Sequence, residues 1–246
     1  MFYLKPDHLD SDFRPDQAVQ NWAAEFQRLA QQARDPRLQS YYRAGMVAAD
    51  TPISQAPLVA MDFETTGLDP EHDGIVSIGL VPLSLARIRC ADAREWILRP
   101  RAPLSSSSVV IHGITHSEVA DADDLSSIIA PLLEALTGRI LVVHCSEIER
   151  KFLDAALRLR IGEGIRFPVI DTLELEARLH RPLSIWSQLF KRQQVSIALA
   201  ESRSRYRLPF YRPHHALTDA LACAELLQAQ VADRFTPETP VSELWS

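Results

Sequence analysis

Two acidic residues stand two positions apart at the end of an apolar run, in the segment VAMDFETTG that covers residues 59–67. Side chains of a β-strand alternate between its two faces, so Asp62 and Glu64 would project from the same face. Two carboxylates on one face repel each other unless solvent, basic residues or a metal ion neutralise them. If a metal ion does so, this strand end belongs to a catalytic site.

A second acidic position lies in the segment HCSEIERKFLDAAL, residues 144–157, whose spacing predicts a helix. Glu149 heads the apolar stripe of that helix, which continues through Phe152, Leu153, Ala156 and Leu157. The neighbouring Glu147 lies on the charged stripe with Arg150, Lys151 and Asp154, as is typical of a solvated face. Glu149 is therefore expected to point inward, where a carboxylate needs a partner. A salt bridge, or a place at the edge of the core, is the alternative to a catalytic role.

A third acidic position lies in the segment HHALTDALACAELLQAQ, residues 214–230. On a helix, Asp219 shares a stripe with Cys223, Leu226 and Gln230, so it also faces inward. His214 lies off that stripe and follows Pro213, which places it in the loop before the helix. A loop histidine beside a carboxylate site can accept a proton, although a helix-capping or surface role is the alternative.

Taken in this order, these motifs resemble the DnaQ-like (DEDDh) 3′–5′ exonuclease superfamily, which includes polymerase proofreading subunits, RNase T and oligoribonucleases. The first motif of that superfamily, Asp-x-Glu-Thr-x-Gly, matches Asp62, Glu64, Thr65 and Gly67. Its second acid falls on Glu149, and its third motif, His-x-x-x-x-Asp, matches His214 and Asp219. A further signature, His-Gly-Ile-Thr, is present at residues 112–115. The resemblance covers roughly residues 58–231.

The resemblance implies a metal-dependent exonuclease that removes nucleotides from single-stranded or frayed 3′ ends, with DNA favoured over RNA. The expected metal ligands of two Mg²⁺ or Mn²⁺ ions are Asp62, Glu64, Glu149 and Asp219, since these ions prefer carboxylate oxygens. Together with His214, the general base, they form the expected catalytic set. The residues expected to contact the substrate are Thr65, Thr66, Gly67, His112, Gly113, Ile114, Thr115, Arg207 and Arg212.

One residue departs from the pattern of the superfamily, which usually has Asp where this chain has Glu149. The extra methylene could shift a metal ion or mark a lost activity. Glu149 therefore leaves open an inactive module that only binds nucleic acid. An RNA-trimming or oligoribonuclease-like enzyme also stays open, since no residue in the sequence reports on the 2′-hydroxyl. Asp171 is left out of the metal site, because Asp171 and Glu174 fit a cap before a helix, as Thr115 and Glu118 do before another.

The formal net charge of −6 argues against a nucleic-acid partner, but the charges are unevenly distributed. Residues 177–215 contain eight Lys or Arg and a single acid, Glu201. Within this basic segment, SRSRYRLPFYRPHH (202–215) interleaves four Arg with Tyr206, Phe210 and Tyr211. Such a mixture can hold phosphates while its aromatic rings stack on bases, although a solvated loop is the alternative.

Composition indicates a folded protein, since 46% of the 246 residues are hydrophobic. The three widely spaced cysteines form no CxxC pair and favour a reducing compartment over a zinc or disulfide framework. The first residues lack the apolar core of a signal peptide, and no apolar stretch is long enough to span a bilayer. We therefore expect a cytoplasmic protein without a membrane partner.

The periodicity predicts strands at 58–64, 74–82, 94–99, 139–144 and 167–170, and helices at 116–137, 146–160, 172–180 and 215–231. This order predicts an α/β fold, an RNase H-like mixed sheet flanked by helices. An N-terminal helical extension, with a helix at 15–34 and a shorter one after it, would cover apolar surface. The expected domains are 1–57 (extension and linker), 58–232 (exonuclease domain) and 233–246 (tail). The tail leaves little room to tether a polymerase.

Overall fold

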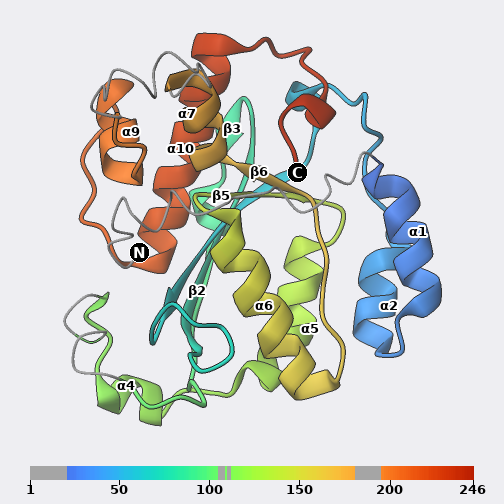
Figure 1. Ribbon diagram of the computed structural model, residues 1–246, viewed down its shortest axis with the longest axis vertical. Coiled ribbons are helices and arrows are strands. Elements are labelled where there is room, and N and C mark those ends of the chain that lie inside the picture. Colours follow the sequence, from blue (N-terminus) through green and yellow to red (C-terminus); the bar gives the residue numbers. More distant parts are fainter. Residues whose placement is uncertain (1–20, 105–108, 110–111, 181–194) are drawn as a thin grey trace, which may run out of the picture.

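The computed structural model describes residues 21–104, 109, 112–180 and 195–246. These residues form a six-stranded mixed sheet with helices packed around it (Figure 1). The strands are β1 (Leu58–Thr65), β2 (Ile75–Ser84), β3 (Arg87–Ile88), β4 (Arg94–Ile97), β5 (Ile140–Val143) and β6 (Val169–Asp171). Their order is β3-β2-β1-β5-β6, and β4 pairs with β2. The five predicted strands are thereby confirmed, and the short β3 is an addition to them.

Strand β1 occupies the centre of this sheet. It runs antiparallel to β2 on one side and parallel to β5 on the other. All eight of its residues are buried, as expected of a strand that is covered on both faces. The acidic end of β1 is therefore held inside the molecule by the same strand pairing that buries its apolar residues.

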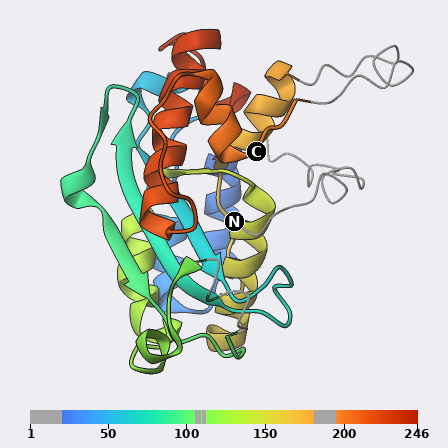
Figure 2. The same cartoon turned by 90° about the vertical axis from the view of Figure 1, so that its left-hand side faces the viewer.

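The described residues after β4 form further helices, most of which pack on this sheet or on another helix. They are α4 (His116–Ala120), α5 (Leu125–Leu136), α6 (Ser146–Ile161), α7 (Thr172–His180), α9 (Leu199–Arg205) and α10 (Ala216–Arg234). The long helix α10, red in Figure 2, packs against β1, β2 and β5, and α6 packs against β1 and β6. Short 3₁₀ turns lie at Ile53–Gln55, Cys90–Asp92 and Val241–Glu243.

The prediction of one continuous helix over 116–137 is wrong, because the chain forms two helices there. Helix α4 ends at Ala120 and α5 begins at Leu125. Asp124 caps α5 by accepting a hydrogen bond from the Ser126 amide at 2.9 Å. The same carboxylate pairs with Arg160 of α6 at 2.8 Å, so its position depends on a residue far along the chain.

The N-terminal extension contains α1 (Trp22–Gln32) and α2 (Pro36–Arg43), while residues 15–20 of the predicted first helix lie outside the described residues. Its apolar residues belong to the same hydrophobic cluster as the sheet. The rings of Phe26, Tyr41 and Tyr42 lie with centroids 5.1–5.3 Å apart. Glu163, which follows α6, accepts hydrogen bonds from the backbone amides of Arg34 and Asp35. The extension is thus attached to the rest of the fold by both apolar and polar contacts.

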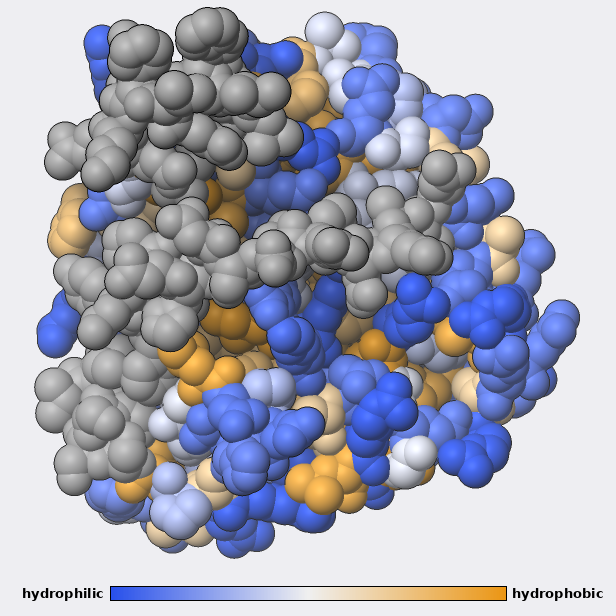
Figure 3. Space-filling view, in the orientation of Figure 1, coloured by the Kyte–Doolittle hydropathy of each residue, from blue (hydrophilic) through white to orange (hydrophobic). Residues whose placement is uncertain are grey.

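The segment after α10 also enters this cluster, through Val241, Leu244 and Trp245. The amide of Ser246 donates to the Val169 carbonyl at 2.8 Å, next to β6. On the face shown in Figure 3, the described residues are mostly hydrophilic, and hydrophobic side chains lie in small separate groups. None of the helices in the described part of the chain is long and apolar enough to cross a bilayer.

Phe26→Ala tests whether the N-terminal helices are energetically part of this core. Because Phe26 is fully buried against three other rings, its truncation should cost about 3–5 kcal/mol of unfolding free energy. Urea unfolding should shift as a single transition, since one cluster connects the extension to the sheet. Gln27→Ala, an exposed position on the same helix, is the control and should change stability little. A separate early transition in Phe26→Ala would show that the extension unfolds by itself.

Candidate metal and nucleic-acid site

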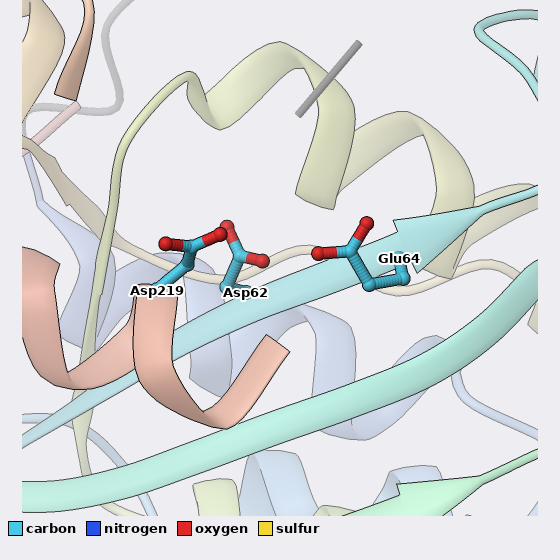
Figure 4. A group of neighbouring side chains, drawn as sticks. All are labelled: Asp62, Glu64 and Asp219. Atoms are coloured by element: carbon cyan, nitrogen blue, oxygen red, sulfur yellow. The ribbon is translucent and has the colours of Figure 1, made fainter. Parts of the chain in front are cut away.

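Three carboxylates from two distant parts of the chain converge at the end of β1. Asp62 and Glu64 project from β1, and Asp219 projects from the first turns of α10. One oxygen of each lies within 4.8 Å of one oxygen of the others, and all three side chains are buried. In Figure 4, the carboxylate of Asp219 lies beside that of Asp62, and the carboxylate of Glu64 points toward them. The structure therefore brings together three of the four predicted metal ligands.

Helix α10 reaches this position because the sheet leaves room for it at Gly79. Asp62 of β1, Gly79 of β2 and Glu95 of β4 are partners in one row across the sheet. A Cβ atom on Gly79 would lie 2.3 Å from the carbonyl carbon of Ala216, the first residue of α10. The helix thus packs directly on the strand backbone, and His215, which precedes Ala216, lies 3.6 Å from Glu95. This close contact places Asp219 over the carboxylate of Asp62.

Glu149 lies outside the group of three but is buried close by. It projects from the first turn of α6 and is 2% exposed, whereas Glu147 of the same helix forms an exposed ion pair with Lys151. The position of α6 depends on Asp171, whose carboxylate accepts hydrogen bonds from the amides of Cys145 (3.1 Å) and Ser146 (2.7 Å). The inward direction predicted for Glu149 is therefore observed.

Asp171 caps α7 as well, because it also accepts a hydrogen bond from the Leu173 amide at 2.9 Å. One carboxylate thus joins the beginnings of two helices. This is the capping role expected from the sequence, extended to a second helix.

Asp62, Glu149 and Asp219 form no ion pair with Lys or Arg among the described residues. Burial raises the pKa of Glu149 to about 8 and that of Glu64 to about 7. Burial, and then the charges of Asp219 and Glu64, raise the pKa of Asp62 well above its ordinary value. Within the described part of the chain, Asp62 Oδ2 and Glu149 Oε2 are buried and accept no hydrogen bond. A divalent cation fits these observations, because the donors are all carboxylate oxygens and the site gathers several of them in the interior.

The two histidines predicted for the site have different surroundings. His214 adopts a positive φ of 73°, and its backbone amide donates to Asp219 Oδ2 at 2.8 Å. Burial lowers the pKa of His214 to about 4, so its imidazole is neutral at pH 7. His112 accepts a hydrogen bond at Nδ1 from the Ile114 amide, so its neutral ring carries a proton on Nε2. The backbone of His214 is thus fixed to one of the acids, and its ring is neutral at pH 7.

The loop after β1 is closed by its own side chains. The hydroxyl of Thr66 donates to Asp73 at 2.9 Å and accepts from the Gly74 amide at 3.0 Å, and that of Thr65 donates to the Gly67 carbonyl. A Cβ atom on Gly67 would lie 2.2 Å from an Asp73 oxygen, so a glycine is needed there. The side chains of Thr65 and Thr66 therefore shape this loop, and contact of Thr65, Thr66 and Gly67 with a substrate stays a prediction.

The segment His112–Thr115 precedes α4, and Thr115 caps that helix in a capping box with Glu118. This confirms the structural role predicted for the Thr115 side chain. Gly113 has a positive φ of 74° and open space where a Cβ would be. Its conformation, rather than crowding, explains why glycine suits the turn.

The basic segment is less available to phosphates than its composition suggests. Arg203 is buried and pairs with Glu225 at 2.7 Å, Arg205 pairs with Glu176, and Arg178 pairs with Glu174 at 2.5 Å. The exposed Arg207 and Arg212 form no ion pair with another described residue. Arg181, Lys191 and Arg192 lie outside the described residues. Of the described cations in this segment, two can therefore meet a phosphate without first leaving a partner.

Two positions at this site were not identified from the sequence. Gly79 interrupts an apolar strand, and an isolated glycine in a strand indicates that another backbone approaches closely. The isolated glycine in the predicted strand 74–82 could therefore have indicated that a helix packs at Gly79. Glu95 shows no such pattern, because its closeness to His215 and its hydrogen bond from Ser77 depend on tertiary packing.

Comparison with known proteins shows that most of the chain, residues 59–227, is similar to exonucleases. The RNase T family, described as exonuclease, matches residues 59–227. The chain is 30% identical over 172 residues to a PolC-type DNA polymerase III of Caldanaerobacter subterraneus, and 29% identical over 187 residues to that of Bacillus subtilis. These matches cover 70% and 76% of this chain but only 11% and 12% of the polymerases. A DNA polymerase III subunit epsilon-like protein of Rhodobacter capsulatus is 29% identical, over 72% of this chain and 24% of that protein.

Solved structures share the fold at lower sequence identity. Exonuclease X in complex with 5′ overhanging duplex DNA has a TM-score of 0.57 and 23% identity, over 76% of this chain and 98% of that one. The nuclease domain of 3'hExo, a DEDDh family member bound to rAMP, has a TM-score of 0.59 and 19% identity, over 72% of this chain and 92% of that one. These likenesses confirm the predicted RNase H-like α/β fold.

Gly79→Ala should weaken divalent-cation binding, because the added Cβ forces the first turn of α10, and with it Asp219, away from Asp62. Displacing a group that orients a ligand typically lowers metal affinity about 10- to 100-fold. Titration calorimetry with Mn²⁺ measures this. Val81→Ala, a truncation two residues further along the same strand, is the control for lost stability without a displaced helix. Equal Mn²⁺ affinity in Gly79→Ala and the parent would show that the contact does not position Asp219.

The stability of the metal-free protein should fall as the pH rises from about 6.5 to 8. The pKa values of Glu64 and Glu149 are raised from an ordinary 4.5, so in this window the folded chain holds protons that the unfolded chain has released. Below this window the buried His144 and His214, whose pKa values are lowered to about 4, oppose the effect. Thermal unfolding in chelator at several pH values measures the effect. Glu149→Gln should flatten the dependence, while Glu147→Gln, an exposed acid two residues away, should leave it intact. A parent curve that is flat or rises between pH 6.5 and 8 would contradict this account.

Proposed function

Because this chain belongs to the RNase T family of exonucleases, we propose that it removes nucleotides one at a time from single-stranded or frayed DNA 3′ ends. Family membership confirms the resemblance to DnaQ-like 3′–5′ exonucleases that the motifs indicated, and with it the enzyme class of a phosphodiester hydrolase. The finer points, which are the substrate, the number of metal ions and the base, are proposed from the site itself.

The observation that carries the proposal is the convergence of buried carboxylates at the end of β1. Burying three acids within 4.8 Å of one another is unfavourable unless a ligand compensates their charge. A purely structural role would favour pairing each acid with Arg or Lys, as the chain does at Arg203 and Glu225. Asp62, Asp219 and Glu149 form no such pair within the described residues, and the family to which the chain belongs depends on divalent metals.

Asp62, Glu64, Glu149 and Asp219 are the residues that would hold two Mg²⁺ or Mn²⁺ ions. Bound there, such ions make a water molecule nucleophilic and stabilise the leaving 3′ oxygen. Glu149 lies outside the group formed by the other three acids. Its side chain is one methylene longer than that of the Asp usual in this family, so it could reach them from the first turn of α6. Mn²⁺ should be tolerated better than Mg²⁺, which demands stricter octahedral geometry.

His214 acts in this proposal as the general base that takes a proton from the attacking water. Its ring is neutral at pH 7, so it can accept a proton at an unprotonated ring nitrogen. Its backbone is fixed to Asp219 through the amide hydrogen bond, which anchors this residue at the site. A phosphate group that enters the site would favour the protonated ring and so strengthen the base.

DNA is the proposed substrate because the sequence relatives are DNA polymerases and an epsilon-like protein, although each exceeds this chain in length. RNA trimming is the second proposal, since one structural neighbour is described in recognition of a histone mRNA stem-loop. Incubation with end-labelled DNA and RNA oligonucleotides of one sequence separates the two. Cleavage of RNA alone would overturn the DNA proposal.

Activity should disappear in excess chelator and return with Mn²⁺ or Mg²⁺. Glu149→Gln should lose most of this activity, because it keeps the shape of the side chain but removes its charge, whereas Glu149→Asp should retain a measurable fraction. Release of mononucleotides from labelled 3′ ends is the measurement. Full activity of Glu149→Gln would exclude this residue from the site. A parent that degrades no 3′ end with either metal would support the inactive binding module.

His214→Ala should lower the turnover rate by about 10²- to 10⁴-fold, the usual contribution of a general base. Its Mn²⁺ affinity should stay near that of the parent, because a base is not a metal ligand. His215→Ala, the adjacent exposed histidine, is the matched control and should lose much less activity. If His214→Ala loses metal affinity in proportion to rate, the residue acts as a ligand or a structural group instead.

A further inference from the structure

The loop that leads from α9 to the site presents one aromatic ring to solvent and keeps two others against the protein. The ring of Phe210 is 81% exposed. Tyr211, its neighbour, donates a hydrogen bond to Glu225 Oε1 at 3.0 Å and lies 4.6 Å from the guanidinium of Arg203. Tyr206 is partly buried beside Glu176, and burial and that carboxylate raise its pKa. Of these three rings, Phe210 is the one that can receive a partner.

Hydrogen bonds to the residues on both sides of Phe210 keep its ring exposed to solvent. Arg203 donates to the carbonyl of Pro209 at 2.9 Å, to the carbonyl of Ala222 at 2.6 Å and to Glu225 at 2.7 Å. The residues on both sides of Phe210 are therefore tied, through Arg203 and Glu225, to helix α10. A free loop could fold its phenyl ring onto the surface to reduce contact with water, but these bonds hold the neighbouring residues in place.

The charges beside this ring suit a nucleic acid rather than an apolar surface. Arg207 and Arg212 flank Phe210, are exposed and form no ion pair with another described residue. No acidic residue occurs between positions 202 and 215. His214 follows Phe210 by four residues, so the ring stands on the loop that carries the proposed base. An aromatic ring between two unpaired cations matches a base between two phosphates.

We propose that Phe210 is a stacking platform for a base of the single strand that enters the site, with Arg207 and Arg212 at the adjoining phosphates. This inference deepens the proposed exonuclease function and rests on it. The ligand is single-stranded nucleic acid upstream of the nucleotide being removed. Because every base has a flat face, the platform accepts any sequence, and it contributes binding rather than chemistry.

Phe210→Ala should raise KM for a labelled 20-nucleotide strand by about 5- to 150-fold, the range expected for one lost base stack, while kcat changes less. The p-nitrophenyl ester of thymidine 5′-monophosphate offers no second base, so its KM should rise less. The matched control is Leu159→Ala, which truncates an apolar residue of α6 that is 60% exposed. This variant should behave as the parent. An unchanged KM for the long strand in Phe210→Ala would overturn the proposal.

Phe210→Trp provides a measurement that does not depend on turnover. Combined with Asp62→Asn to stop cleavage, the new indole should lose fluorescence when the oligonucleotide binds, and the four native tryptophans are subtracted with Asp62→Asn alone. The oligonucleotide could bind tightly without quenching the fluorescence of the indole at position 210. This result would show that Phe210 faces away from the strand and would favour a protein partner for it. If the parent degrades no 3′ end, the proposed function fails, yet the quenching still reports whether a strand meets Phe210.

Discussion

The crowding of buried carboxylates at the end of β1 is the constraint on which the rest of the structure depends. Like charges separate unless the fold forces them together, and here Asp62 and Glu64 are fixed by a strand that is buried on both faces. Asp219 is fixed by α10, whose inward residues Cys223, Leu226 and Gln230 are almost fully buried. Burial of those side chains, at about 25 cal/mol per Å² of apolar surface, offsets the repulsion that the acids bring. A bound cation would relieve this repulsion between the carboxylates.

Two local features let the helices begin so close to one another. Gly79 removes the side chain that would keep α10 off the sheet. Asp171 binds the first amides of α6 and also caps α7, which brings a helix cap of about 1 kcal/mol to each. Cys145 adopts φ 104° at the start of α6, a conformation that L residues rarely take. Such strain at a strand-to-helix junction is tolerated because Asp171 holds the amides of Cys145 and Ser146.

The features that follow from periodicity could be predicted from the sequence. The features that depend on a contact with a residue far along the chain could not. The alternation along β1 and the stripes through Glu149 and Asp219 gave the correct inward faces, because burial imposes a period on the chain. The break between α4 and α5 was missed, since Asp124 is held by Arg160 from another helix. The basic segment was overestimated for the same reason. Its arginines bind Glu225, Glu176 and Glu174, and of these only the last lies within one turn of its partner.

That correction changes how an acidic protein can bind a polyanion. If all the basic residues of the segment met phosphates, long-range attraction would dominate binding and salt would weaken it steeply. With Arg203 and Arg205 committed to the fold, the exposed arginines among the described residues 195–215 are Arg207 and Arg212. Attraction by these described residues therefore acts at short range, through a few phosphate contacts, an aromatic ring and the acidic site itself. A site of this kind recognises the end of a strand, because only an end can bring its last phosphate to buried carboxylates while the preceding nucleotides lie along the loop.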